Sequence, residues 1–172
     1  MFRLLGGILI IGGMTGLGRL YVKNIQLKIE ELERWEYIFQ LFQSQITYKK
    51  QPLPLACREI GGKISTKEGA VLVNIGEKIG NGQGAGFRKE WEKHWQPYLQ
   101  DSYLSQEEKN CVLEFGTFTG FEEEMLQNNM LKQQQEKIRN FRLQVQEETR
   151  EKKRVIMLLS SCAGILLVLI LL

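Results

Sequence analysis

The feature that most constrains this chain is an apolar run in its C-terminal part. Residues 155–172 read VIMLLSSCAGILLVLILL, which is 18 residues without a charged side chain. Roughly 17–25 apolar residues are enough for a helix to cross a bilayer. A buried helix of a soluble core is seldom free of charge over such a length. We therefore predict a basic flank and a transmembrane helix within residues 151–172.

Residues 1–22 predict a second transmembrane helix. Residues 4–18 are uncharged, and extension through Val22 gives 19 residues. As a helix they span ~28 Å, close to the thickness of the hydrocarbon layer. A cleaved signal peptide is the alternative. No A-x-A-like cleavage site follows the apolar run, so we expect a retained span.

The first predicted span is rich in glycine. Gly12 and Gly16 make a GxxxG match, a spacing that lets helix backbones approach closely in lipid. General enrichment of glycine in membrane helices explains the match equally well. The two residues are candidates for helix packing or partner binding.

Basic residues predict the orientation of the chain. Seven lie on the inner sides of the two spans, and only Arg3 lies beyond either span. The seven are Arg19, Lys23, Lys28, Arg150, Lys152, Lys153 and Arg154. Cytoplasmic flanks carry an excess of such residues, so we expect residues 23–150 in the cytoplasm and both termini outside it.

Helical periodicity runs through residues 23–150, which predict an all-α bundle. Apolar side chains at spacings of three and four predict an amphipathic helix over 23–48 that continues out of the first span. A short helix is expected to begin near Pro54 and to end at the two glycines at 61–62. Ser65 and Glu68 have the spacing of a capping box that opens a third helix.

The next stretch, residues 80–86, reads GNGQGAG. Gly80, Gly82 and Ala85 superficially match a dinucleotide-binding fingerprint, which requires a preceding strand in a βαβ unit. The preceding residues are helical in pattern, so we expect an interhelical loop.

Aromatic residues dominate the following helix. Phe87, Trp91, Trp95 and Tyr98 form a stripe at helical spacing, typical of core packing. A second capping box, at 105–108, opens a helix that carries Val112, Phe115 and Phe118. From Phe121 onward one long helix is expected to enter the second span. We predict that Trp35, Trp91, Trp95 and Phe115 lie in the core.

Composition argues against catalysis, metal binding and nucleic-acid binding. The chain has one histidine, His94, and three isolated cysteines, so no catalytic triad or clustered metal ligands are expected. The net charge is +3, and no basic stripe is interleaved with stacking aromatics. Neither span carries paired ionisable residues, which disfavours an intramembrane enzyme. We expect no enzyme activity and no cofactor.

Four regions resemble the stage III sporulation protein AB family of endospore-forming bacteria. The regions are residues 2–6, residues 46–48 followed by 52–56, residues 113–120 and residues 150–172. They are similar to a basic-apolar-glycine opening, an Ile-x-Tyr…Pro-Leu-Pro-x-Ala turn, a Leu-Gly-x-x-Leu-Gly segment and a basic lead-in to an apolar tail. The chain departs from the family at two places. The family usually has acidic residues where this chain has Gln43 and Gln45, and it usually has Ser-Asp where this chain has Glu122 and Glu123.

The resemblance implies a fold and a function. The family resembles the F-type platform domain of type II secretion and type IV pilus machines. It implies a membrane-anchored, non-enzymatic platform in the mother-cell membrane around the forespore. The implied partners are a hexameric secretion-type ATPase like sporulation protein AA and other channel subunits. Gly116 and Gly120 are further candidates for packing or partner contact. A membrane-tethered regulatory adaptor is the alternative, and self-association stays open.

Overall fold

The computed structural model of the chain describes residues 2–82, 84, 86–120 and 128–150, with the side chains of residues 2–22 and 118–120 outside the described part. Every regular element in this part is a helix, and no strand occurs in it, so the predicted all-α class is confirmed. The elements are α1 (Phe2–Gln43), the π-helical turn η1 (Ser44–Tyr48), α2 (Leu53–Lys63), α3 (Lys67–Gly80), α4 (Phe87–Gln100), α5 (Gln106–Glu114), the 3-10 helix η2 (Phe115–Gly120) and a helix over 128–150.

The predicted membrane spans stay predictions. Within the described part of the chain, no helix combines the length and the apolar character needed to cross a membrane. The C-terminal run 155–172 lies outside the described residues, as do the side chains of residues 2–22. The backbone of residues 2–22 begins α1, so the expected continuation of the first apolar run into the helix after it is confirmed.

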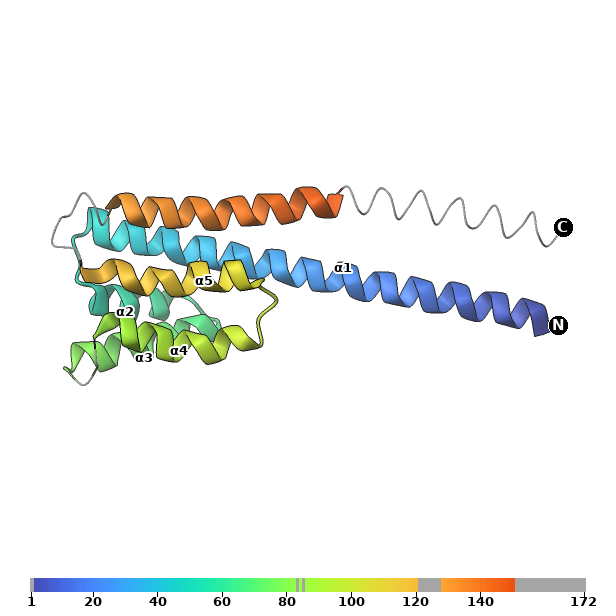
Figure 1. Cartoon of the computed structure of the whole chain (residues 1–172). Coiled ribbons are helices and arrows are strands. Elements are labelled where there is room, and N and C mark those ends of the chain that lie inside the picture. Colours follow the sequence, from blue (N-terminus) through green and yellow to red (C-terminus); the bar gives the residue numbers. More distant parts are fainter. Residues whose placement is uncertain (1, 83, 85, 121–127, 151–172) are drawn as a thin grey trace.

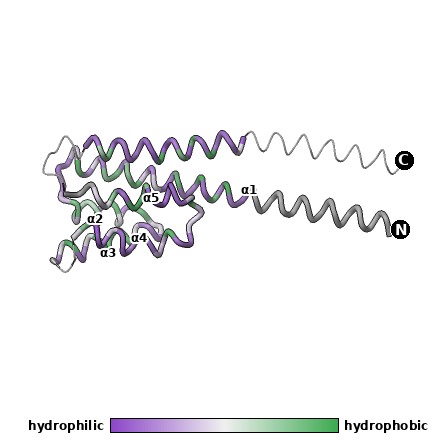
Figure 2. The backbone as a smooth tube through the Cα atoms, viewed as in Figure 1, coloured by the Kyte–Doolittle hydropathy of each residue, from purple (hydrophilic) through white to green (hydrophobic). Residues whose placement is uncertain are grey.

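The C-terminal half of α1 and the helix over 128–150 lie side by side and run in opposite directions (Figure 1). Near the end of α1, Thr47 Oγ1 donates a hydrogen bond to Asn128 Oδ1 at 3.0 Å. Further back along α1, Arg142 Nε donates to Glu36 Oε2 at 2.7 Å. Hydrophilic residues prevail along the helix over 128–150 (Figure 2), as expected of a helix with one packed stripe. The predicted long helix is confirmed for 128–150, while 121–127 lie outside the described residues.

An aromatic core fills the space between α1, α4 and η2. Trp35 on α1 meets Trp95 on α4 edge-on, with ring centroids 4.6 Å apart. Phe115 lies 4.8 Å from Trp91 and 5.0 Å from Phe39. The four residues predicted for the core are all fully or almost fully buried, so that prediction is confirmed. Offset and edge-to-face pairs at these distances are the favoured aromatic geometries.

Two local predictions about helix ends are wrong. The second helix continues past Gly61 and ends at Lys63, and the third has Thr66 as its N-cap without a side-chain cap hydrogen bond. Glu68 is instead buried and bonded to Arg34. The capping box at Ser105 is confirmed, because Ser105 Oγ accepts from Glu108 N and Glu108 Oε2 accepts from Ser105 N.

The connection between α3 and α4 is a loop, as the sequence predicts. A helix precedes it, so the strand required by the dinucleotide fingerprint is not there. The helix that starts at Gln106 is α-helical only to Glu114 and then tightens into η2. Phe115, the first residue of η2, lies in the aromatic core.

Candidate functional site

The four glycines proposed as contact residues lie in different parts of the chain. Gly116 packs on the indole of Trp91, and a Cβ built there would lie 2.7 Å from Trp91 Cδ1. Gly116 therefore serves close packing inside the bundle. Gly120 is the last residue of η2, and the structure does not describe what surrounds it, so its role stays a prediction. Gly12 and Gly16 lie in the part of α1 whose side chains are not described, so their role in partner contact stays a prediction.

A second set of close-packed glycines escaped the sequence analysis. They lie between α2 and α3, which form a tight helical hairpin. A Cβ at Gly61 would lie 2.5 Å from Gly69 O, and one at Gly76 would lie 2.6 Å from Pro54 O. Only glycine permits backbones to approach this closely. The spacing of seven residues from Gly69 to Gly76, two helical turns, is the signal that marks this face.

A buried polar network ties the hairpin to α1. Arg34 Nε donates to Glu68 Oε1 at 2.9 Å, and Glu31 Oε2 accepts from the backbone N–H of Tyr103 at 3.0 Å. Burial raises the pKa of Glu31 despite that hydrogen bond. Burial also acts to raise the pKa of Glu68, but hydrogen bonds from Thr66, Tyr98, the backbone and Arg34 outweigh it and lower the pKa. The network holds Glu68 ionised and fixes the position of α3.

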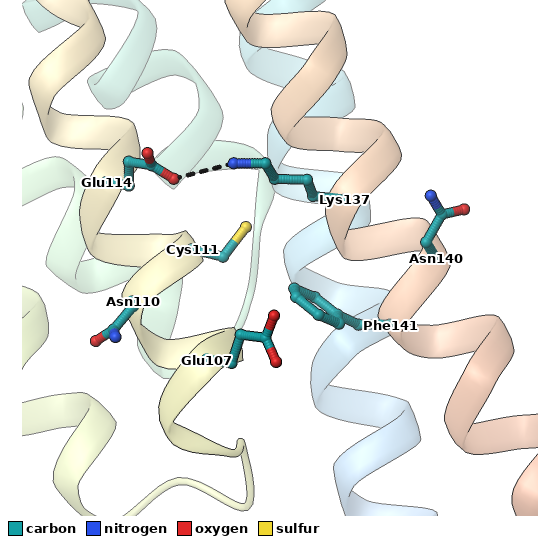
Figure 3. A pocket seen from close by; sticks show the side chains of 7 residues that line it. All are labelled: Glu107, Asn110, Cys111, Glu114, Lys137, Asn140 and Phe141. Atoms are coloured by element: carbon teal, nitrogen blue, oxygen red, sulfur yellow. Dashed lines mark hydrogen bonds and ion pairs between the residues drawn. The ribbon is translucent and has the colours of Figure 1, made fainter.

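A pocket lies between α5 and the helix over 128–150 (Figure 3). Its volume is about 410 Å³. Cys111 faces this pocket, and Lys137 Nζ forms an ion pair with Glu114 Oε2 at 3.3 Å across it. Its lining is Glu107, Asn110, Cys111, Glu114, Lys137, Asn140 and Phe141.

The chemistry of this pocket does not favour catalysis. Burial raises the pKa of the Cys111 thiol to about 12, so the thiolate needed for nucleophilic attack is scarce at neutral pH. Burial likewise raises the pKa of the Cys57 thiol. Within the residues that the structure describes, no group of three His, Cys, Asp or Glu side chains is placed to hold a metal ion.

The connection between α1 and α2, residues 44–52, has an unusual backbone. We refer to it as the 44–52 turn. It begins with the π-helical η1, in which Lys49 N donates to Ser44 O at 3.3 Å. Lys50 follows with a φ of 53°, the only positive φ of a non-glycine residue in the described part. Gln51 N then donates to Gln45 O at 3.1 Å and closes the turn. Single π-turns and left-handed non-glycine residues are both enriched at functional sites.

Side chains fix the 44–52 turn to both neighbouring helices. Gln51 Nε2 donates to Glu59 Oε1 on α2 at 2.8 Å, and Thr47 donates to Asn128 at the start of the helix over 128–150. Gln45 is buried beneath the turn, with 1% of its surface exposed. Tyr48, by contrast, is 79% exposed, more than any other large apolar side chain in the described part. The turn is thus a fixed frame that holds one aromatic ring in solvent.

Comparisons with known proteins identify the family of this chain. Residues 3–172 match the family described as stage III sporulation protein AB. A solved structure titled stage III sporulation protein AB (SpoIIIAB) superimposes with a TM-score of 0.64 at 14% sequence identity. The match covers 73% of this chain and 98% of that chain, and at this identity it shows a shared fold. Among the curated proteins compared, none matches.

Proposed function

The chain belongs to the stage III sporulation protein AB family and acts in sporulation, and from this premise we propose that it is a non-enzymatic membrane platform subunit of a secretion-like channel complex. The complex would link the mother cell and the forespore. The central domain would dock a cytoplasmic secretion-type ATPase, and the flanking segments 1–22 and 151–172 would anchor it in the mother-cell membrane.

One observation carries this proposal: the antiparallel pairing of α1 with the helix over 128–150 (Figure 1). The pairing brings the start of α1 and residue 150 to the same side of the bundle. Two apolar flanks leaving from one side can enter one membrane, which leaves the bundle on one face of it. The basic residues that adjoin both flanks favour the cytoplasmic face.

Ion pairs join α1 to the helix over 128–150 and to α5. Arg142 is half-buried and pairs with Glu36 at 2.7 Å, while a second carboxylate, Glu33, lies 4.0 Å away. Lys28 on α1 pairs with the buried Glu108 of α5 at 2.9 Å. Charge-assisted hydrogen bonds of this kind are stronger than neutral ones. These ion pairs fix the described ends of the helices relative to one another, as a platform requires.

The properties of the polar groups support work by contact rather than by catalysis. The buried carboxylates Glu68 and Glu108 are engaged in ion pairs between helices. The buried thiols have raised pKa values. The polar side chains thus join helices to one another.

Co-purification and deletion test the proposal. The full chain, tagged and extracted from sporulating cells in mild detergent, should bring down the sporulation protein AA-like ATPase, and a deletion strain should arrest after engulfment while growing normally. In a cysteine-free background, a cysteine added after Leu172 should react with an impermeant thiol reagent in intact cells, and one at Asn81 should not. A chain that retains no ATPase while the deletion still blocks sporulation would favour the tethered adaptor. Normal sporulation of the deletion strain would overturn both readings.

A further inference from the structure

The pocket of about 410 Å³ between α5 and the helix over 128–150 has no part in the proposed function (Figure 3). We refer to it as the α5 groove. We propose that it docks an arginine side chain of a partner protein, whose guanidinium stacks on Phe141 and pairs with Glu107. The inference follows from the residues that line the groove, so it stands or falls separately from the platform function.

Charge identifies the kind of occupant. Glu114 and Lys137 neutralise each other at one end of the groove, with 3.3 Å between Lys137 Nζ and Glu114 Oε2. Glu107 lies two helical turns away on α5, at the other end (Figure 3). Among the described residues, its exposed carboxylate has no hydrogen-bond or ion-pair partner. The lining therefore carries one unpaired negative charge, which complements a cation.

The cation that fits is a side chain. Within the described part of the chain, no three His, Cys, Asp or Glu side chains are placed to hold a metal ion, so Glu107 has no companions as a metal ligand. Asn140 also lines the groove, and its exposed carboxamide has no hydrogen-bond partner among the described residues. A carboxamide both donates and accepts, so it can bind the N–H or C=O of a peptide. Glu107 and Asn140 together favour a basic peptide segment.

The apolar part of the groove favours arginine. Cys111 Sγ and the Phe141 ring point into the gap from the two helices, and the Glu107 carboxylate is turned toward that ring (Figure 3). Because burial raises the pKa of the Cys111 thiol to about 12, the thiol stays neutral and acts as a small apolar surface. The stem of an arginine covers such a surface, while its planar guanidinium stacks on an aromatic ring and pairs with a carboxylate through two hydrogen bonds. Lysine has no planar group, so it matches the groove less well.

The walls of the groove are fixed before a partner binds. Buried Gln134 donates from Nε2 to the backbone carbonyl of Cys111, which joins the helix over 128–150 to α5. The Lys137–Glu114 ion pair joins the same two helices. A site held in place in this way avoids the entropy cost of ordering on binding. Its volume of about 410 Å³ falls within the ~300–1,000 Å³ typical of binding pockets.

Binding of a small arginine peptide to the full chain in nanodiscs tests the inference. The probe is the amide of Leu-Arg-Leu with a trifluoroacetyl cap, followed by fluorine NMR. Its control is the same peptide with citrulline, which has the shape of arginine without the charge. The arginine peptide should bind about tenfold more tightly or better, as expected of hydrogen bonds to charged groups. Glu107→Gln should remove this difference, and Phe141→Leu should weaken binding of the arginine peptide about two- to fivefold. Glu77→Gln, at an exposed position on α3, should leave both Kd values unchanged.

The outcomes that overturn the inference leave the platform function in place. No binding of the arginine peptide, equal affinities for the two peptides, or a preference that Glu107→Gln leaves intact would each show that the groove does not select arginine. Equal binding to empty nanodiscs would show that the peptide binds lipid, and the inference would be wrong. If Glu107→Gln instead weakens self-association in sedimentation experiments, the groove is a contact between copies of this chain. Unchanged circular dichroism and melting temperature confirm folding, which Glu107→Gln should preserve because it alters an exposed side chain in the first turn of α5.

Discussion

Replacing Trp91 with alanine removes the side chain at the centre of the aromatic core. Its ring lies within 6 Å of four aromatic rings, measured between centroids: Phe42 at 5.9 Å, Phe87 and Trp95 each at 5.4 Å, and Phe115 at 4.8 Å. Its Nε1–H donates to the backbone carbonyl of Val112 at 2.9 Å. The side chain has no exposed surface. The substitution therefore opens a cavity and leaves a buried acceptor without its donor.

The expected loss is large compared with the stability of such a domain. Truncation of a buried Phe or Trp to Ala costs ~3–5 kcal/mol, and an orphaned buried carbonyl adds ~1 kcal/mol or more. The total of ~4–6 kcal/mol is comparable with the ~5–15 kcal/mol by which domains are folded. At ~2–4 °C per kcal/mol, the melting temperature should fall by ~10–20 °C. The chain should also fail to accumulate in cells.

Thermal unfolding of the full chain in detergent, followed by near-UV circular dichroism, measures this loss. Trp91→Phe is the matched control, because it keeps an aromatic ring and removes the hydrogen bond to Val112. It should fall between the wild type and Trp91→Ala. A Trp91→Ala protein that melts within 2 °C of the wild type would contradict the assignment of Trp91 to the centre of the core.

Two further predictions concern the α2–α3 hairpin. Gly69→Ala should destabilise the chain by ~1–3 kcal/mol, since the new Cβ would press on the backbone oxygens of Gly61 and Ile64. Gly62→Ala, with open space around it, should stabilise the chain by ~0.5–1 kcal/mol. Equal effects in thermal melts would refute the close approach. Glu68 has a folded-state pKa below its ordinary value of 4.5, so its contribution is present above pH 4.5 and is lost as the pH falls through the folded pKa. Glu68→Gln should therefore lower stability at pH 7 and flatten its loss below pH 4.5. The same pH profile in Glu68→Gln and the exposed control Glu136→Gln would count against this role.

The aromatic core was predictable because its signal is local and periodic. Trp35 and Phe39, like Trp91 and Trp95, are four residues apart, which places each pair on one helix face. Large aromatic rings on the inner face of an amphipathic helix have few alternatives to burial. The capping box at Ser105 was predictable for the same reason, since both of its partners lie within one helical turn.

The capping box at Ser65 failed because a distant partner competes for its glutamate. Arg34 lies 34 residues before Glu68 in the chain and outside any local pattern. Glu68 also accepts hydrogen bonds from the side chains of Thr66 and Tyr98. Two of these three side-chain partners lie more than 25 residues from Glu68, so the spacing at 65–68 does not predict them. The prediction that α2 ends at Gly61 is also wrong because of a contact distant in the sequence. Gly61 lets α3 pack closely against α2 and does not end α2.

The 44–52 turn shows why an exposed aromatic side chain is harder to predict from a sequence than a buried one. Tyr48 follows an apolar series that ends at Ile46, and composition alone favours an interior place for an aromatic ring. Its exposure arises from the π-helical η1 and from the left-handed Lys50, neither of which has a composition signal. Pro52 follows as the N-cap of α2, and Thr47 bonds to Asn128, which lies 81 residues further along the chain. A side chain held outside by contacts this far apart in the chain is visible only once the helices are in place.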